Sequence, residues 1–332
     1  MSLAAFTLDW LFRSLAVGSI AAASVFVCPA AWRVRVRRAI PCAAFVALLL
    51  LPLGSLAPVA VEVPASLALA INTHADSSWL AMWWLVGVLL CVARLANGAC
   101  AIRALLRETC AVPGEDWTAC LAAAKATLGL HARVHLRLAG PGFIPSATGL
   151  FRRTILLPDE ALRWTTEQRR LVLLHELGHF RRGDLWIHAL GRFVCALHWF
   201  NPFAWMLHHL LSVEREYAVD DLVVQHGVAP TDYATVLWQM AKAATRRPRA
   251  AAAYLAMAQY QPGKLEQRVQ RILAPTGKKN RIHGFLDAAV CLAIAALLFV
   301  CSACHPIANA QPGDYTPDEI QTRLAADPFP GE

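Results

Sequence analysis

Charged residues are scarce in this sequence, and features that mark several other kinds of protein are missing. Only 16% of the 332 residues are Asp, Glu, Lys or Arg, whereas 57% are hydrophobic. This composition excludes an ordinary soluble domain and favours an integral membrane protein. There is no internal repeat, and no nucleic-acid-binding motif accompanies the net charge of +8. We therefore expect the lipid bilayer as a partner and no direct contact with nucleic acid.

Four apolar stretches are long enough to cross a bilayer, which requires about 20 residues. They lie at about residues 11–32, 40–61, 79–99 and 284–303. A cleavable signal peptide is the alternative for the first stretch. However, Asp9 precedes this stretch and a basic cluster follows it, which is the reverse of the charge order in a signal peptide. We therefore expect four transmembrane helices.

Lys and Arg are absent from residues 62–78, between the second and third stretches, and this absence sets the expected orientation. The connection between the first two stretches is basic and contains Arg33, Arg35, Arg37 and Arg38. By the positive-inside rule, the N-terminus lies outside and this basic connection lies in the cytoplasm of a bacterial-type inner membrane. The predicted organisation is three transmembrane helices in 1–100, a cytoplasmic domain at 101–283, a fourth transmembrane helix at 284–303 and an extracytoplasmic tail at 304–332.

Cys301, Cys304 and His305 form the C-x-x-C-H pattern of c-type haem attachment. The residues that follow include neither Met nor His, so they offer no second axial ligand. We interpret the pattern as a coincidence or a redox-prone pair of thiols, and a membrane haem protein remains an alternative. The ten cysteines are scattered and indicate no disulfide framework.

The cytoplasmic domain is predicted to be mostly helical with a small sheet. Alternation and β-rich composition predict strands at 133–140 and 154–158. Thr165, followed by Glu and Gln, predicts the start of a helix that carries the motif discussed next. Further helices are expected at 119–128, 205–227, from about 231, and at 264–273.

His175, Glu176 and His179 form an H-E-x-x-H motif within the predicted helix. Residues four apart share one helix face, so the two imidazoles can bind one Zn²⁺. Glu176 stands where it can take a proton from the attacking water. The apolar run around the motif is bounded by arginines and is too short to cross a bilayer, which argues against an intramembrane protease.

A catalytic zinc usually has three protein ligands. The segment EREYAVDD offers Glu216 and Asp220 on one helix face. One carboxylate can reach the metal while the other lies behind it and binds a ligating histidine. A solvated acidic helix face is the alternative for this segment taken alone.

Four segments in order resemble the BlaR/MecR-type membrane metallopeptidases, which are antirepressor proteases of β-lactam sensing. They are PSATGLFRRTILLP, LLHELGHFRRGDL, HWFNPFAW and EREYAVDD. The resemblance implies an α-helical membrane protein with a cytoplasmic α+β domain of gluzincin type. It implies one Zn²⁺ per chain bound by His175, His179 and Glu216, with Glu176 as the base.

The resemblance also implies roles for two further acids and for the partners. Asp220 is expected to lie behind a ligand, and Asp184 is expected to be a structural acid near the end of the active helix. The implied substrate is a protein, either a cytoplasmic transcriptional repressor or the protease itself. Members that detect β-lactams carry a penicillin-binding domain after the last span, and this sequence has no S-x-x-K there. We therefore expect a separate outer sensor or direct sensing by the spans, and a homodimer also stays open.

Several alternatives and details remain open at this stage. A quality-control membrane protease has the same chemistry, and a non-proteolytic receptor with structural zinc is a second alternative.

We expect Thr154–Leu157 to be an edge strand that pairs with extended substrate. Tyr217 and Tyr233 are both candidates for stabilising the oxyanion. The apolar stretch Leu185–Leu207 is expected to break at Asn201-Pro202 and to lie in the domain or at the membrane interface, next to the spans.

Overall fold

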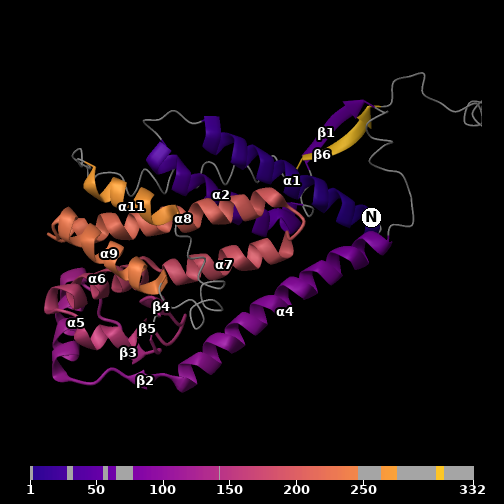
Figure 1. Cartoon of the computed structure of the whole chain (residues 1–332). Coiled ribbons are helices and arrows are strands. Elements are labelled where there is room, and N and C mark those ends of the chain that lie inside the picture. Colours follow the sequence, from indigo (N-terminus) through magenta and orange to yellow (C-terminus); the bar gives the residue numbers. More distant parts are fainter. Residues whose placement is uncertain are drawn as a thin grey trace, which may run out of the picture.

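The computed structural model describes residues 3–27, 33–54, 59–64, 78–141, 143–245, 263–274 and 304–309. The expected fourth transmembrane helix at 284–303 and Cys301 lie outside the described residues. The chain begins with the helices α1 (Leu3–Val27), α2 (Arg33–Gly54) and α4 (Ser78–Glu108). The described part is mostly helical, with two small sheets (Figure 1).

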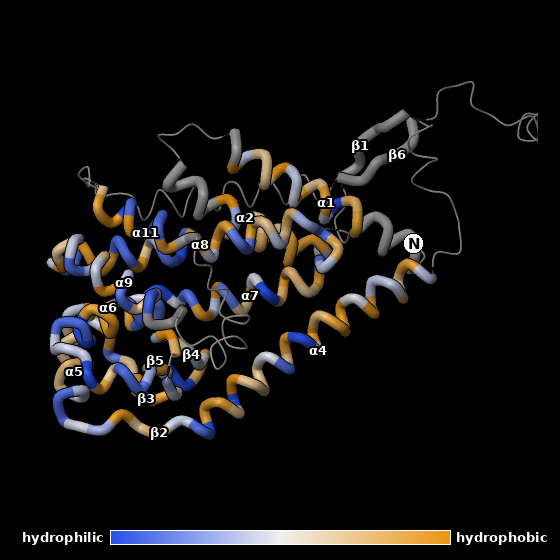
Figure 2. Tube along the Cα trace, viewed as in Figure 1, coloured by the Kyte–Doolittle hydropathy of each residue, from blue (hydrophilic) through white to orange (hydrophobic). Residues whose placement is uncertain are grey.

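Among the described residues, the segment Trp79–Glu108 of α4 is the one helix both long and apolar enough to cross a membrane. Hydrophobic residues run along most of it (Figure 2). α1 and α2 hold shorter apolar segments, Trp10–Val25 and Ile40–Leu51. Of the second expected span, 40–61, the helix α2 covers the part up to Gly54, and residues 59–61 belong to a strand. The third expected span, 79–99, lies within α4, which continues to Glu108.

The strand β1 (Val59–Pro64) pairs in parallel with β6 (Cys304–Asn309). Val59 lies opposite Cys304, and Pro64 lies opposite Asn309. The two strands lie well away from α5 and α6 (Figure 1). The connection after α2 and the segment after residue 303 therefore meet in space. Two residues of the C-x-x-C-H pattern, Cys304 and His305, belong to β6.

A second sheet has the strand order β2-β3-β5-β4. Its strands are β2 (Cys110–Ala111), β3 (His135–Leu138), β4 (Ser146–Thr148) and β5 (Thr154–Leu157). β5 pairs in parallel with β3 and antiparallel with β4. The expectation that Thr154–Leu157 forms an edge strand was therefore wrong. All four of its residues are buried, as the apolar sequence TILL requires, and the short strand β4 forms the edge.

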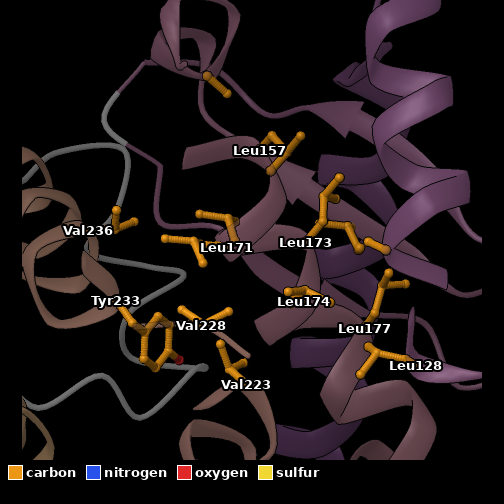
Figure 3. Close-up of a cluster of buried hydrophobic side chains, with 14 of the residues drawn as sticks. Leu128, Leu157, Leu171, Leu173, Leu174, Leu177, Val223, Val228, Tyr233 and Val236 are labelled. Carbon is orange, nitrogen blue, oxygen red and sulfur yellow. The ribbon is translucent and has the colours of Figure 1, made fainter. Parts of the chain in front are cut away.

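The helix α6 (Thr166–Arg182) lies at the centre of the larger buried core, and its start was predicted correctly. Gln168 N donates to Thr165 Oγ1 over 3.2 Å, and Thr165 N donates to Gln168 Oε1 over 3.0 Å, which together form a capping box. Every residue from Leu171 to Phe180 is buried. Its leucines pack against β5, α5 (Glu115–Leu128), α8 (Pro202–Gln225) and α9 (Pro230–Thr245) (Figure 3).

The apolar stretch 185–207 forms a helical hairpin of α7 (Asp184–Leu197) and α8, and the break falls at Asn201-Pro202 as expected. Asn201 caps α8 by accepting from Phe203 N over 3.0 Å. Its Nδ2 also donates to the carbonyl oxygen of Ser14 in α1 over 2.7 Å. Val194, Cys195, Ala204, Leu207 and Leu211 of the hairpin pack into one core with α1 and α2. The hairpin therefore lies between the N-terminal helices and the core around α6.

The turn of this hairpin contacts all three N-terminal helices. Beyond the Asn201 contact with α1, His198 hydrogen-bonds Ser14 Oγ at 2.7 Å and the carbonyl oxygen of Leu48 in α2 at 3.2 Å. Trp199 lies directly against Gly87 of α4, where an added Cβ would come within 2.0 Å of the indole ring. Only glycine at position 87 allows this approach.

We predict that Asn201→Ala destabilises the fold by about 2–3 kcal/mol, because it removes a helix cap and the buried hydrogen bonds that join α8 to Ser14 of α1. Unfolding in detergent-purified protein, followed by circular dichroism during titration with SDS, should show an earlier transition. Ser19→Ala is the matched control, because its exposed hydroxyl bonds only a carbonyl of its own helix in the described contacts. Equal transitions for the two variants would contradict the role assigned to Asn201.

Candidate metal centre

His175, His179 and Glu216 come together although α6 and α8 are separated by a complete helix in the chain. One potential ligand atom of each lies within 4.8 Å of the others. His175 Nε2 lies 3.6 Å from Glu216 Oε2, and His179 Nε2 lies 3.8 Å from Glu216 Oε1. Both histidines are buried, and the Glu216 side chain is about a quarter exposed. The cluster therefore has one open side.

Gly178 accounts for the close approach of the two helices. A Cβ at this position would lie 2.9 Å from Val219 Cγ1 and 3.2 Å from Leu222 Cδ2. Such contacts are closer than ordinary packing allows, so a larger residue would push α8 away from α6. The crossing at Gly178 lies one residue before His179, and Val219 lies one turn after Glu216. The glycine thus brings the carboxylate of α8 to the imidazoles of α6.

The ring of His175 is held by a buried chain of hydrogen bonds. Tyr233 of α9 donates its hydroxyl proton to Asp220 Oδ1 over 2.7 Å. Its oxygen lies 2.7 Å from His175 Nδ1, so the hydroxyl accepts the Nδ1 proton. Burial, together with the neighbouring Asp220 carboxylate, raises the pKa of Tyr233 well above its ordinary value, which keeps the hydroxyl protonated. The Nε2 lone pair of His175 is then left to face Glu216.

The ring of His179 is held by Asp184. α6 ends at Arg182, its capping residue Gly183 has a φ of 69°, and α7 starts at Asp184. This turn returns the Asp184 carboxylate to α6, where its Oδ2 accepts from His179 Nδ1 over 3.0 Å and from Arg182 Nε over 3.2 Å. Asp184 was expected to be a structural acid near the helix end. The structure also gives it direct contact with a candidate ligand.

Glu216 is surrounded by positive and polar groups. Burial alone would raise the pKa of its carboxyl, but the neighbouring His179, His175, Arg268 and Arg215 together hold the pKa well below its ordinary value. Arg215 Nη2 donates to Glu216 Oε1 over 3.1 Å, and Arg268 Nη1 lies 3.3 Å from Oε2. Glu216 therefore stays ionised, which a carboxylate ligand requires.

Glu176 follows His175 in α6 and is 5% exposed. Burial lowers the pKa of His175, but the carboxylates of Glu216, Glu176 and Asp220 outweigh this effect and raise the pKa above its ordinary value. Glu176 therefore contributes to the electrostatics of the site. The acid expected to act as the base is therefore buried and lies next to His175 in the helix. It is not part of the three-residue cluster itself.

Two residues of the site were not anticipated in these positions. Tyr233 was a candidate for stabilising the oxyanion, but its hydroxyl is engaged with His175 and Asp220. The hydroxyl of the other candidate, Tyr217, donates to Gln267 over 3.2 Å. Arg268 of α11 (Gly263–Leu273) was missed, because an arginine on an amphipathic helix resembles any surface arginine until the helix is placed.

The residues fit a zinc ion by their chemistry and spacing. Two neutral imidazoles and one carboxylate are typical zinc ligands. Tetrahedral ligands at about 2.0–2.1 Å from the metal are separated from one another by about 3.3–3.5 Å. The two histidines lie 3.6 and 3.8 Å from the two different oxygens of Glu216, and one potential ligand atom of each residue lies within 4.8 Å of the others, so small side-chain rotations would give such separations. Both Nδ1 atoms have acceptors, as is usual for ligating histidines.

Known proteins resemble this chain over most of its sequence. A family model described as BlaR1 peptidase M56 matches residues 20–272, which include α6, α8 and most of α11. The regulatory protein BlaR1 of Bacillus licheniformis is 29% identical over 150 residues, which cover 45% of this chain. That alignment spans only 25% of the relative's own length. Because the family model covers more than half of the sequence, the chain belongs to the BlaR1 peptidase M56 family.

Proposed function

We propose that this protein is a membrane-anchored zinc endopeptidase that transduces a signal by cutting a cytoplasmic regulator, itself or both. The observation that carries the proposal is that His175, His179 and Glu216 each bring one potential ligand atom within 4.8 Å of the others. Each imidazole is oriented by a buried partner, and the cluster stands in a member of a peptidase family.

In this proposal each residue of the site has a distinct part. His175, His179 and Glu216 hold the metal, which when bound supplies a Lewis acid that polarises the scissile carbonyl and activates water. Glu176 takes a proton from the attacking water and returns it to the leaving amine. Asp220, through Tyr233, and Asp184 hold the imidazoles in the tautomer whose Nε2 is free. The quarter-exposed side of Glu216 is where substrate approaches.

The proposal places the site at the cytoplasmic face of a bacterial inner membrane. α4 is apolar and exposed enough to cross the bilayer, and α1 and α2 pack beside the hairpin that leads to the site. The distribution of arginines supports a cytoplasmic peptidase domain. The pairing of β1 with β6 supports a common side for the connection after α2 and the segment after residue 303. Both are extracytoplasmic in the proposed topology.

We propose a regulatory role because the relative from Bacillus licheniformis is described as a regulatory protein, and a protease with that role would cut a regulator. A transcriptional repressor in the cytoplasm is the partner that suits a protease at this face of the membrane. A separate outer sensor or a second copy of the chain would supply the signal.

We predict that wild-type cells contain protein N-termini that disappear when Glu176→Ala is expressed at the same level. Loss of a general base slows hydrolysis by about 10²–10⁴-fold. N-terminal proteomics would identify the cuts. A cut repressor or self-cleavage would support signalling, whereas many unrelated cuts would support quality control.

The matched control for this experiment is Glu167→Ala. Glu167 is on the same helix, and its pair with Arg170 is exposed, so the substitution should change stability by less than about 1 kcal/mol. If Glu176→Ala and the wild type gave the same N-termini under every stress applied, the protease proposal would fail.

We also predict one zinc ion per chain in the purified protein and weaker binding in Tyr233→Phe. Loss of the hydroxyl that orients a ligating imidazole lowers metal affinity by about 10–100-fold. Chelator competition followed by metal analysis measures the change. Tyr217→Phe, whose hydroxyl donates to Gln267, should stay within a few-fold of the wild type. Equal affinity of Tyr233→Phe and the wild type would contradict the proposed hydrogen-bond chain.

A further inference from the structure

Arg268 reaches the candidate metal centre from a helix that supplies no ligand. Its Nε donates to Asp220 Oδ2 over 2.8 Å, and its Nη2 donates to Asp220 Oδ1 over 2.7 Å. Its Nη1 lies 3.3 Å from Glu216 Oε2. The side chain is 14% exposed. One guanidinium therefore lies between two carboxylates that are four residues apart on α8.

This placement has an electrostatic cause. Like charges four residues apart on one helix face repel each other, and Asp220 is only 2% exposed, so its charge is costly to bury alone. A guanidinium offers a planar set of donors that binds both oxygens of a carboxylate at once. Arg268 therefore neutralises Asp220 and also fixes the rotation of its carboxylate.

The effect of Arg268 extends to two of the three candidate ligands. It contacts Glu216 directly. It reaches His175 indirectly, because Asp220 accepts from Tyr233 and Tyr233 accepts from His175. Without the guanidinium, the Asp220 carboxylate is free to turn. The hydrogen bonds from His175 to Tyr233 and from Tyr233 to Asp220 are then no longer held in one orientation.

Contacts apart from Arg268 hold α11 in place. Ile272 is buried in the main core, and Val269 packs against it. Arg271 Nη2 lies 3.4 Å from Asp221 Oδ2, and its guanidinium lies 4.6 Å above the Tyr217 ring. Arg271 is thus a second arginine on the same helix that contacts α8 without touching Glu216, Asp220 or the two histidines in the described contacts. It provides a control for the docking of α11 itself.

We propose that Arg268 is a positioning residue of the metal centre, so that the zinc site is completed only when α11 is docked on α8. This inference rests on the proposed zinc site. The direction in which zinc affinity changes when Arg268 is removed distinguishes a positioning role from a simple charge effect. A cationic side chain beside a metal ligand repels the metal, so on charge alone its removal would tighten zinc binding. A positioning role predicts that removal weakens binding.

The test uses the full chain purified in detergent, with Arg268→Gln, Arg268→Lys and Arg271→Gln compared with the wild type. Zinc affinity is measured by chelator competition, and ligand geometry by the visible absorption of the Co²⁺-loaded protein. Arg268→Gln should bind zinc about 10–100-fold more weakly and show an altered Co²⁺ spectrum. Arg268→Lys should be intermediate, because a single ammonium does not bind both carboxylate oxygens as a fork does. Arg271→Gln should resemble the wild type.

The outcomes separate this inference from the proposed function. Unchanged or tighter zinc binding in Arg268→Gln, with an unchanged Co²⁺ spectrum, would overturn the positioning role while leaving the zinc site intact. Equal losses in Arg268→Gln and Arg271→Gln would overturn it in favour of a general need for α11. If the wild-type protein bound no zinc, the proposed function and this inference would both fail. Should Arg268→Gln not fold, Arg268→Lys carries the same comparison.

Discussion

Two imidazole rings on one helix must direct their Nε2 atoms to the same point, and the rest of the centre depends on this requirement. The rings of His175 and His179 are 4.9 Å apart and nearly perpendicular, with an interplanar angle of 88°. An imidazole can present either nitrogen, so a hydrogen bond at Nδ1 is needed to fix both its tautomer and its rotation. The two partners that provide this bond come from different helices, Asp184 from α7 and Tyr233 from α9.

The α7–α8 hairpin connects this centre to the N-terminal helices. It begins with Asp184, behind His179, and its second helix carries Glu216 and Asp220. Its turn, by contrast, binds α1 and α2 through His198 and lies against α4 through Trp199. The carboxylates of the site and the contacts with the apolar helices therefore belong to one structural element. This arrangement is the physical basis for proposing that a signal in the membrane reaches the site.

Features that depend on neighbouring residues in the chain were predicted well. The capping box at Thr165 and the helix break at Asn201-Pro202 are both present, because short-range hydrogen bonds and the geometry of proline act within a few residues. Predictions that depended on distant partners were less accurate. Thr154–Leu157 was correctly predicted as a strand but wrongly as an edge strand, since its place in the sheet depends on β3 and β4.

The sequence by itself determined the chemistry of the candidate site. Helical spacing put His175 and His179 on one face of α6, and Glu216 and Asp220 on one face of α8. These residue types suit zinc. Only the tertiary structure decided which groups complete it. Tyr233 and Arg268 lie far along the chain, on α9 and α11, and nothing in their local sequence marks them. Their roles arise because burial leaves Asp220 and His175 in need of partners, and only packed helices bring such partners within hydrogen-bonding distance.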